Sequence, residues 1–381
     1  MPWHLFRRRD LNLLPLSERE SLTMITDVAY NPAATPPVFN GDLSVIEKTA
    51  TAILHAKATG AAIILAHGAH LIKNGLSPLL RVMIKQGYVT HIATNGAGSI
   101  HDWEFAYQGK SEESVRKYLP EGQFGLWDET GRYINLALLL GAYHQRGYGE
   151  AIGRLIETES LDFPDDLDLS AEIRKRTFST SAEHPSHTIP PLGHMIPLFE
   201  SRRFWANDAW KYHRIPHPFK GYSVQGYAFE KGALFTVHPS IGQDIIYAHP
   251  FCNEAAIGFT ARTDFLRFVK SVENLNGGVY LSVGSAIMSP MVFEKALAMA
   301  RNVAHLKGRR LDDFLIVVND LQEGNWQWGT GREPPKDDPA YYLRMCKTFD
   351  RAGAREMHYV CTDNRTFLGN LYACLRAKDT T

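Results

Sequence analysis

The stretch that decides the fold runs from residue 61 to residue 104 and begins AAIILAHGAH (61–70). Its apolar run ends at His67-Gly68, as a strand buried on both faces of a parallel sheet does where it reaches the sheet edge. Ser77-Pro78 then predicts a helix start, because serine caps helices and proline suits their first turn. This helix ends at Gly87, and a second strand is expected over 89–93. The stretch therefore predicts a strand–helix–strand unit.

Both strands of such a unit point their carboxyl ends to one side, where open α/β sheets bind their ligands. The second strand leads into NGAGS (95–99), and its small residues would let a phosphate or ribose approach the backbone. The pattern lacks the G-x-G-x-x-G fingerprint and is equally typical of a tight structural turn.

The strand and helix rhythm returns after a change in composition. Apolar runs at 234–237, 279–283, 314–318 and 356–361 each end in small or polar residues. We therefore expect one α/β domain over residues 41–381, with a doubly wound, mostly parallel sheet. An irregular N-terminal arm over 1–40 and a loop-rich insertion at about 181–230 complete the predicted organisation.

Composition excludes several classes of protein. The 381 residues carry a formal net charge of zero, whereas nucleic-acid binding needs a concentrated basic face. No apolar run is long enough for a membrane span, and charges interrupt the place of a signal peptide, so we expect a soluble, cytoplasmic protein. The four cysteines are widely spaced, which favours buried free thiols over a disulfide framework.

Five histidines lie in the segment between 181 and 219: His184, His187, His194, His213 and His217. Their pairs resemble metal ligands, but no cysteine or glutamate completes either pair at the usual spacing. The segment would equally serve as a cover over a pocket or a subunit face. We expect no metal site.

Several strand ends resemble motifs of the deoxyhypusine synthase family and its NAD-dependent ornithine cyclodeaminase relatives. The matching stretches are 67–75, 87–89, 94–104, 239–249 and 319–323. They follow the family order and lie at the ends of predicted strands, and the likeness extends over roughly residues 40 to 375. The resemblance implies a sheet of the deoxyhypusine synthase type, a bound NAD, and a homo-oligomer that is a dimer or a tetramer.

Two departures bear on the reaction. The family's Lys-His-His is replaced by GSAIMSP (284–290), and its catalytic lysine falls where YYLR (341–344) stands. Without an amine nucleophile at this place, the enzyme imine of deoxyhypusine formation has no carrier. We therefore expect a relative of the family that is not a true deoxyhypusine synthase.

The resemblance and the strand ends together predict the site residues. The catalytic candidates are His101, Asp102, Asp244, His249 and Glu323. The cofactor-binding candidates are His67, Gly68, Asn95, Gly96, Ala97, Gly98, Gly284, Ser285, Asn319 and Asp320. Carboxylates near a nicotinamide suit a cationic substrate, and a histidine moves protons near neutral pH. The same residue types commonly cap helices, so each could instead be structural.

Two functions remain open. The first is an enzyme of the transferase or lyase type that uses NAD to oxidise a small amine or amino acid transiently, before elimination, cyclisation or group transfer. The second is a non-catalytic NAD-binding or nucleotide-binding protein that keeps the fold. The pair His101-Asp102 and the stretch 319–323 favour the first, whereas the missing lysine favours the second.

Overall fold

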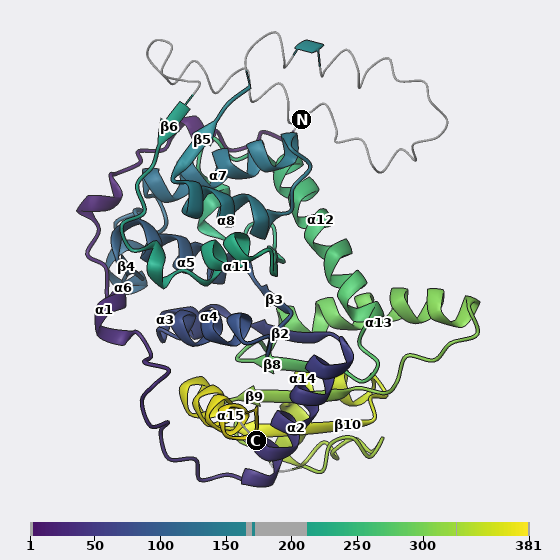
Figure 1. The fold of residues 1–381 in the computed structure, drawn as a ribbon. Coiled ribbons are helices and arrows are strands. Elements are labelled where there is room, and N and C mark those ends of the chain that lie inside the picture. The colour runs from purple at the N-terminus through teal and green to yellow at the C-terminus, as the bar shows by residue number, and fades with distance from the viewer. Residues whose placement is uncertain (1–2, 165–169, 172–211, 325, 380–381) are drawn as a thin grey trace.

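The computed structural model describes residues 3–164, 170–171, 212–324 and 326–379. Its centre is a six-stranded sheet with the order β7-β3-β2-β8-β9-β10 (Figure 1). The strands are β2 (Ile63–His67), β3 (His91–Thr94), β7 (Leu234–Val237), β8 (Val279–Val283), β9 (Leu315–Asp320) and β10 (Glu356–Cys361). Every neighbouring pair is parallel, so the predicted α/β fold with a mostly parallel sheet is confirmed.

The chain winds outward from β2 in both directions. It adds β3 and β7 on one side and then crosses over to add β8, β9 and β10 on the other. Numbered by appearance, the strands read 3-2-1-4-5-6, which is the order of doubly wound sheets that bind dinucleotides. The winding reverses between β2 and β8, and the carboxyl ends of these two strands are where such sheets hold a ligand.

Helices cover both faces of the sheet because its side chains alternate. Ile63 and Leu65 belong to one core cluster, whereas Ile64 and Ala66 belong to the other. The first face is covered by α2 (Leu43–Thr59), α3 (Ala69–Lys73), α4 (Ser77–Lys85) and α15 (Asn364–Asp379). The second is covered by α12 (Glu254–Glu273), α13 (Met288–Leu306) and α14 (Arg344–Asp350).

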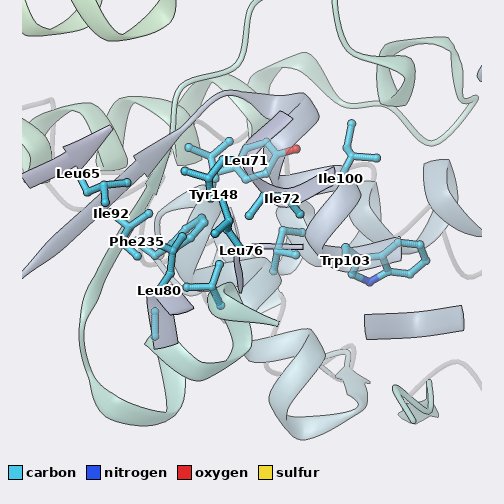
Figure 2. Close-up of a cluster of buried hydrophobic side chains, with 14 of the residues drawn as sticks. Leu65, Leu71, Ile72, Leu76, Leu80, Ile92, Ile100, Trp103, Tyr148 and Phe235 are labelled. Carbon is cyan, nitrogen blue, oxygen red and sulfur yellow. The ribbon is translucent and has the colours of Figure 1, made fainter. Parts of the chain in front are cut away.

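A further group of helices lies beyond α3 and α4, on the side of β3 (Figure 1). It consists of α5 (Gly96–Gln108), α7 (Asp128–Tyr143), α8 (Tyr148–Thr158) and α11 (Val224–Lys231). Figure 2 shows the apolar cluster that joins this group to the sheet, with Leu65 and Ile92 from the strands, Leu71 and Leu80 from α3 and α4, and Trp103 from α5. Burial of one such side chain stabilises the fold by roughly 1.5–3 kcal/mol, so the cluster fixes α5 against the sheet.

The N-terminal arm is more ordered than predicted. Within it, β1 (Thr23–Met24) pairs with β4 (Lys110–Ser111), which directly follows α5, and α1 (Ile25–Val28) buries Ile25 completely. Leu14 forms a bridge with Trp127. The arm is therefore built into the fold from Leu14 onward, although its sequence has no periodic pattern.

The predicted insertion is described only from residue 212 onward, and His184, His187 and His194 lie outside the described residues. Its described part forms β6 (Tyr212–Arg214), which pairs with β5 (Ser160–Asp162), and then α11 packed on α8. That part contains a short strand and a helix, joined by residues 215–223. Over the described ranges, none of the helices has the length and apolar character needed to cross a lipid bilayer.

Candidate functional site

Two glycines close the sheet edge at the point where the winding reverses. Gly68 follows β2 and Gly284 follows β8, and a Cβ atom placed on Gly68 would lie 2.1 Å from the carbonyl oxygen of Gly284. Only glycine permits this approach. Gly284 itself has a φ of 57°, and the space where its Cβ would lie is open. The space beside its Cα is therefore open at the reversal point, while its N–H group donates to the carbonyl oxygen of Asn319 at 2.8 Å.

Three other predicted cofactor residues shape the same edge. Asn319 is buried, and its Nδ2 donates to the carbonyl oxygens of Val360 at 3.1 Å and Thr362 at 2.7 Å, which ties β9 to β10. The Asp320 carboxylate accepts from two backbone N–H groups of its own turn. Ser285 accepts from the N–H group of Ser289 at the start of α13. The structure thus brings the residues after β2, β8 and β9 to one edge.

His67 lies beneath this edge as a buried neutral residue. Its Nδ1 donates to the carbonyl oxygen of Gly68 at 2.9 Å, and its Nε2 has no partner among the described residues. Burial lowers the pKa of His67 to about 4. We conclude that the ring supports the turn between β2 and α3 without carrying charge.

The stretch Asn95–Gly98 is arranged differently from the prediction. The Asn95 side chain accepts from the N–H group of Gly98 at 2.9 Å and caps α5, an interaction that stabilises a helix by about 1 kcal/mol. A Cβ on Gly96 would lie 2.1 Å from Oδ2 of Asp244, and one on Gly98 would lie 2.2 Å from Oγ1 of Thr94. These small residues make room for the protein's own side chains, whereas we expected them to contact a cofactor.

A cavity of about 250 Å³ begins at this turn and follows α5. It contains an unusual number of charged and titratable groups: Arg19, Lys73, His101, Glu104, Glu112, Glu113 and Asp244. The rest of its wall is the polar Gln243 and apolar residues: Ala97, Ile100, Val115, Phe124 and Ile245. This volume lies just below the usual range for ligand sites, about 300–1,000 Å³, and suits a small metabolite rather than a dinucleotide. We call it the α5 cavity.

A buried ion pair forms one side of the α5 cavity. The guanidinium of Arg19 donates to both oxygens of Glu104, at 2.8 and 2.7 Å. Glu104 also accepts from Thr130 Oγ1 at 2.9 Å and from Ser111 Oγ at 2.5 Å. Burial alone would raise the pKa of Glu104, but the charge and hydrogen bonds of Arg19 outweigh it and lower that pKa. Glu104 is therefore an ionised carboxylate with four donors.

These bonds determine the protonation of His101. Its Nδ1 lies 2.7 Å from Ser111 Oγ, whose one hydrogen is already donated to Glu104. Nδ1 must therefore carry a hydrogen and donate it to Ser111. Burial is the main reason that the pKa of His101 falls to about 4, so the ring is neutral and Nε2 is an unprotonated acceptor. No hydrogen bond to Nε2 is present within the described residues, and His101 lines the cavity.

Asp244 stands where the α5 cavity meets the start of α5. Burial raises the pKa of its carboxyl to about 6, although the backbone N–H groups of Ser240 and Ala97 partly oppose the shift. Oδ2 is shielded from solvent and has no hydrogen-bond partner among the described residues. This oxygen is therefore a buried acceptor whose hydrogen-bonding capacity is unused among the described residues.

Asp102 does not reach the cavity, although His101 does. Its carboxylate is buried and accepts from Ser223 Oγ at 2.5 Å and from the N–H groups of Val224 and Gln225 at 3.1 Å. Ser77 Oγ donates a fourth bond at 3.2 Å. These bonds cap the start of α11, so the carboxylate is not open to the substrate contact that we predicted.

The two remaining catalytic candidates also lie elsewhere. His249 accepts at Nδ1 from the N–H group of Phe251 and donates from Nε2 to Asp128 at 3.2 Å, and its ring packs on Gly131 of α7. Burial is the first cause that lowers the pKa of His249 to about 3. Glu323 is exposed in the loop after β9 and does not line the α5 cavity.

Five charged cavity residues were not among the predicted site residues: Arg19, Lys73, Glu104, Glu112 and Glu113. Lys73 and Glu104 lie within stretches that resemble family motifs, whereas no motif or periodicity marks Arg19 in the arm or the two glutamates after β4. No group of histidine, cysteine and carboxylate side chains within the described ranges could hold a metal ion.

No family model and no curated protein matches this sequence. Solved structures with a similar fold include ArgZ, an arginine dihydrolase from the ornithine–ammonia cycle in cyanobacteria, at 13% identity and a TM-score of 0.41. They also include AgrE in a ternary complex with ornithine and NAD⁺, at 15% and 0.43, and a conserved LOR/SDH protein from Methanococcus maripaludis S2, at 12% and 0.42. These alignments cover 88%, 88% and 92% of this chain. The chain spans 33% of ArgZ and AgrE and 74% of the LOR/SDH protein, and similarity at this level assigns no activity.

Proposed function

We propose that this chain is an NAD-dependent enzyme that acts on a small cationic amine or amino acid. One observation carries the proposal: the sheet reverses its winding between β2 and β8, and Gly68 and Gly284 meet there with open space above Gly284. Dinucleotides bind at this position in doubly wound sheets. A reaction of the transferase or lyase type and a homo-oligomeric assembly belong to the same proposal.

The residues at the edge fit a dinucleotide. The N–H group of Ala69, in the first turn of α3, would face the pyrophosphate, since that of Gly68 already donates to the carbonyl oxygen of Val283 at 3.2 Å. The open side of Gly284 and the Ser285 side chain would face the nicotinamide half. The strand next to β2 ends in Thr94 and Asn95, without the carboxylate that commonly holds the ribose of NAD. Bound NAD would supply a hydride acceptor. Asp244 would hold the cationic substrate, and His101 would take a proton at Nε2.

A charge placed on the edge tests the cofactor site. Ala69 is the first residue of α3, where glutamate suits the helix dipole but would repel a pyrophosphate. We expect Ala69→Glu to weaken NAD binding at least about tenfold and the neutral, equally large Ala69→Gln to weaken it less. Calorimetric titrations of each variant with NAD and with NADP measure the affinities. Equal affinities in the two variants would exclude this position for the pyrophosphate.

Turnover separates the enzyme from the non-catalytic alternative. We expect the absorbance of reduced nicotinamide to appear transiently when NAD-loaded protein is mixed with a cationic amino acid such as ornithine, or with a small amine. Stable NAD binding with no spectral change and no product across such a panel would favour a nucleotide-binding protein. Deoxyhypusine should not form, because Arg344 is no nucleophile at neutral pH.

A further inference from the structure

The charges around the α5 cavity do not cancel. Its two cations are already paired, Arg19 with Glu104 and Lys73 with Glu112. Asp244 and Glu113 also face the cavity, and neither has a cation partner within the described residues. The cavity therefore has an excess of carboxylates.

The hydrogen-bonding groups of the cavity add to this preference for a cation. Nε2 of His101 is an acceptor because Ser111 and Glu104 hold the ring in its Nδ1–H form. Oδ2 of Asp244 is a second acceptor without a partner. Glu113 takes hydrogen bonds from Trp127 Nε1 at 2.8 Å and from the N–H group of Gly125 at 3.0 Å, which hold its carboxylate in place. His101 Nε2 and Asp244 Oδ2 are thus two acceptors without a partner among the described residues, and together they favour a ligand that donates.

We propose that the α5 cavity binds a small aliphatic amine as its cation, with Asp244 pairing the charge and His101 Nε2 accepting one N–H. Ile100, Val115 and Phe124 contact the aliphatic part. Ser111 is a positioning residue that acts through His101. That the amine is a substrate rests on the enzyme function proposed above. Binding of the amine, however, can be measured in the absence of NAD.

The arrangement also predicts what the cavity rejects. A carboxylate entering the site would meet two cations whose donors are directed at resident glutamates, together with two unneutralised carboxylates. The carboxylates of Asp244 and Glu113 would repel the carboxylate of the ligand. The amine end of a ligand is therefore selected, and an anion of the same length is excluded.

Three probes of equal chain length test the selection: 1-butylamine, 1-butanol and butyrate. We expect measurable binding of the amine alone in calorimetric titrations at neutral pH. Asp244→Asn keeps the shape and removes the charge, and it should weaken amine binding at least about tenfold. Glu121→Gln, a charge change at an exposed residue that does not line the cavity, is the matched control and should change it less than about twofold. Butyrate binding as tightly as the amine, or equal losses in the two variants, would overturn the proposal.

The ring of His101 gives a readout that does not depend on activity. Nitrogen chemical shifts of ¹⁵N-histidine-labelled protein, assigned with His101→Gln, should show the Nδ1–H form and a shift of Nε2 when butylamine is added. Ser111→Ala should convert the ring at least partly to the Nε2–H form and weaken amine binding by about threefold to tenfold, the range for one hydrogen bond. An Nε2–H ring in the unaltered protein would refute the assignment.

The same titrations with NAD keep the two proposals apart. Amine binding without any NAD affinity would leave the cavity assignment standing and remove the dinucleotide enzyme. NAD binding with no amine affinity, in the absence and in the presence of NAD, would remove the cavity assignment alone. Asp244→Asn should leave NAD affinity within about twofold, because Asp244 is not among the residues that we expect to hold the cofactor.

Discussion

Arg19 and Glu104 lie 85 positions apart in the sequence and meet in a buried pair of charge-assisted hydrogen bonds. The contact joins the N-terminal segment to the middle of α5 and forms one side of the α5 cavity. Both side chains are 1% exposed, so neither charge has water to replace its partner. The arm is therefore part of the site.

Replacing Arg19 should be costly. Arg19→Met leaves the Glu104 carboxylate buried without its cation, and breaking a buried pair in this way costs about 3–5 kcal/mol. Urea unfolding followed by circular dichroism measures the loss. Arg7→Met is the matched control, since the Arg7–Asp10 pair is exposed and contributes only about 0–1 kcal/mol. Similar losses in both variants would contradict a structural role for the buried pair.

Asp102 should affect stability rather than cofactor binding. Asp102→Asn turns one of the two oxygens that receive the donors of α11 and Ser77 into an NH₂ group. We expect a loss of about 1–3 kcal/mol in unfolding free energy, with NAD affinity unchanged. Asp27→Asn, at an exposed position, should cost less than about 0.5 kcal/mol. A selective loss of substrate affinity in a fully stable Asp102→Asn protein would restore its predicted role.

Gly96→Ala should act through Asp244. The added methyl group would fall 2.1 Å from Oδ2, so the carboxylate must move out of its place. We expect amine affinity to fall at least about fivefold while NAD affinity stays nearly constant. Gly258→Ala, with nothing within 4 Å of its Cβ position, is the control. Loss of NAD binding in Gly96→Ala would instead support the original expectation that this turn holds the cofactor.

Buried histidines should make the protein lose stability at a higher pH than protonation of its carboxylates alone would. Burial lowers the pKa of His67 to about 4 and that of His238 to about 3, from an ordinary value of 6.5. Their neutral forms stabilise the fold fully above pH 6.5, and this contribution is lost as the pH falls toward 4 and 3. Asp244 and Asp264, whose pKa values burial raises to about 6 and about 7, act in the opposite direction.

Burial also raises the pKa values of Asp102 and Glu113, but the buried histidines outnumber all four carboxyl groups, so we expect the unfolding free energy to fall between pH 6.5 and 4. Urea titrations across this range measure it. A variant of His91 tests this expectation, because burial is the main reason that the pKa of His91 is lowered to about 3. His91→Asn should flatten the slope by up to about 1.4 kcal/mol per pH unit, whereas His55→Asn, at an exposed residue, should leave it unchanged. A stability that stays flat down to pH 4 would contradict the assignment of neutral rings.

The sheet was predictable because each strand is a short apolar run that ends in small or polar residues. Strands β7, β8 and β10 begin and end at the predicted residues. The start of α2 shows the limit: Ser44-x-x-Glu47 has the pattern of a capping box, but Asp42, two residues earlier, accepts from the N–H group of Ser44 and is the N-cap. Local patterns fix the type of an element better than its first residue.

The positions of the site candidates were predictable only where they coincide with strand ends. Gly68, Gly284 and Asn319 lie at the expected edge because strand ends of a parallel sheet meet there. Arg19 and Glu113 could not be found, because their role depends on tertiary contacts of an irregular segment. For Asp102 the motif was misleading: the residue lies within a family-like stretch, but its carboxylate caps α11, as acidic residues at helix starts commonly do.

The position of β2 has a consequence for how the chain reaches its native state. This strand is made early, yet its neighbour β8 comes from the last third of the sequence, and Ile63 aligns with Val279. A chain leaving the ribosome must carry the exposed edge of β2 through the synthesis of several helices before that partner arrives. We expect slow refolding, with a collapsed intermediate that exposes Ile64 and Ala66 and aggregates readily until β8 docks.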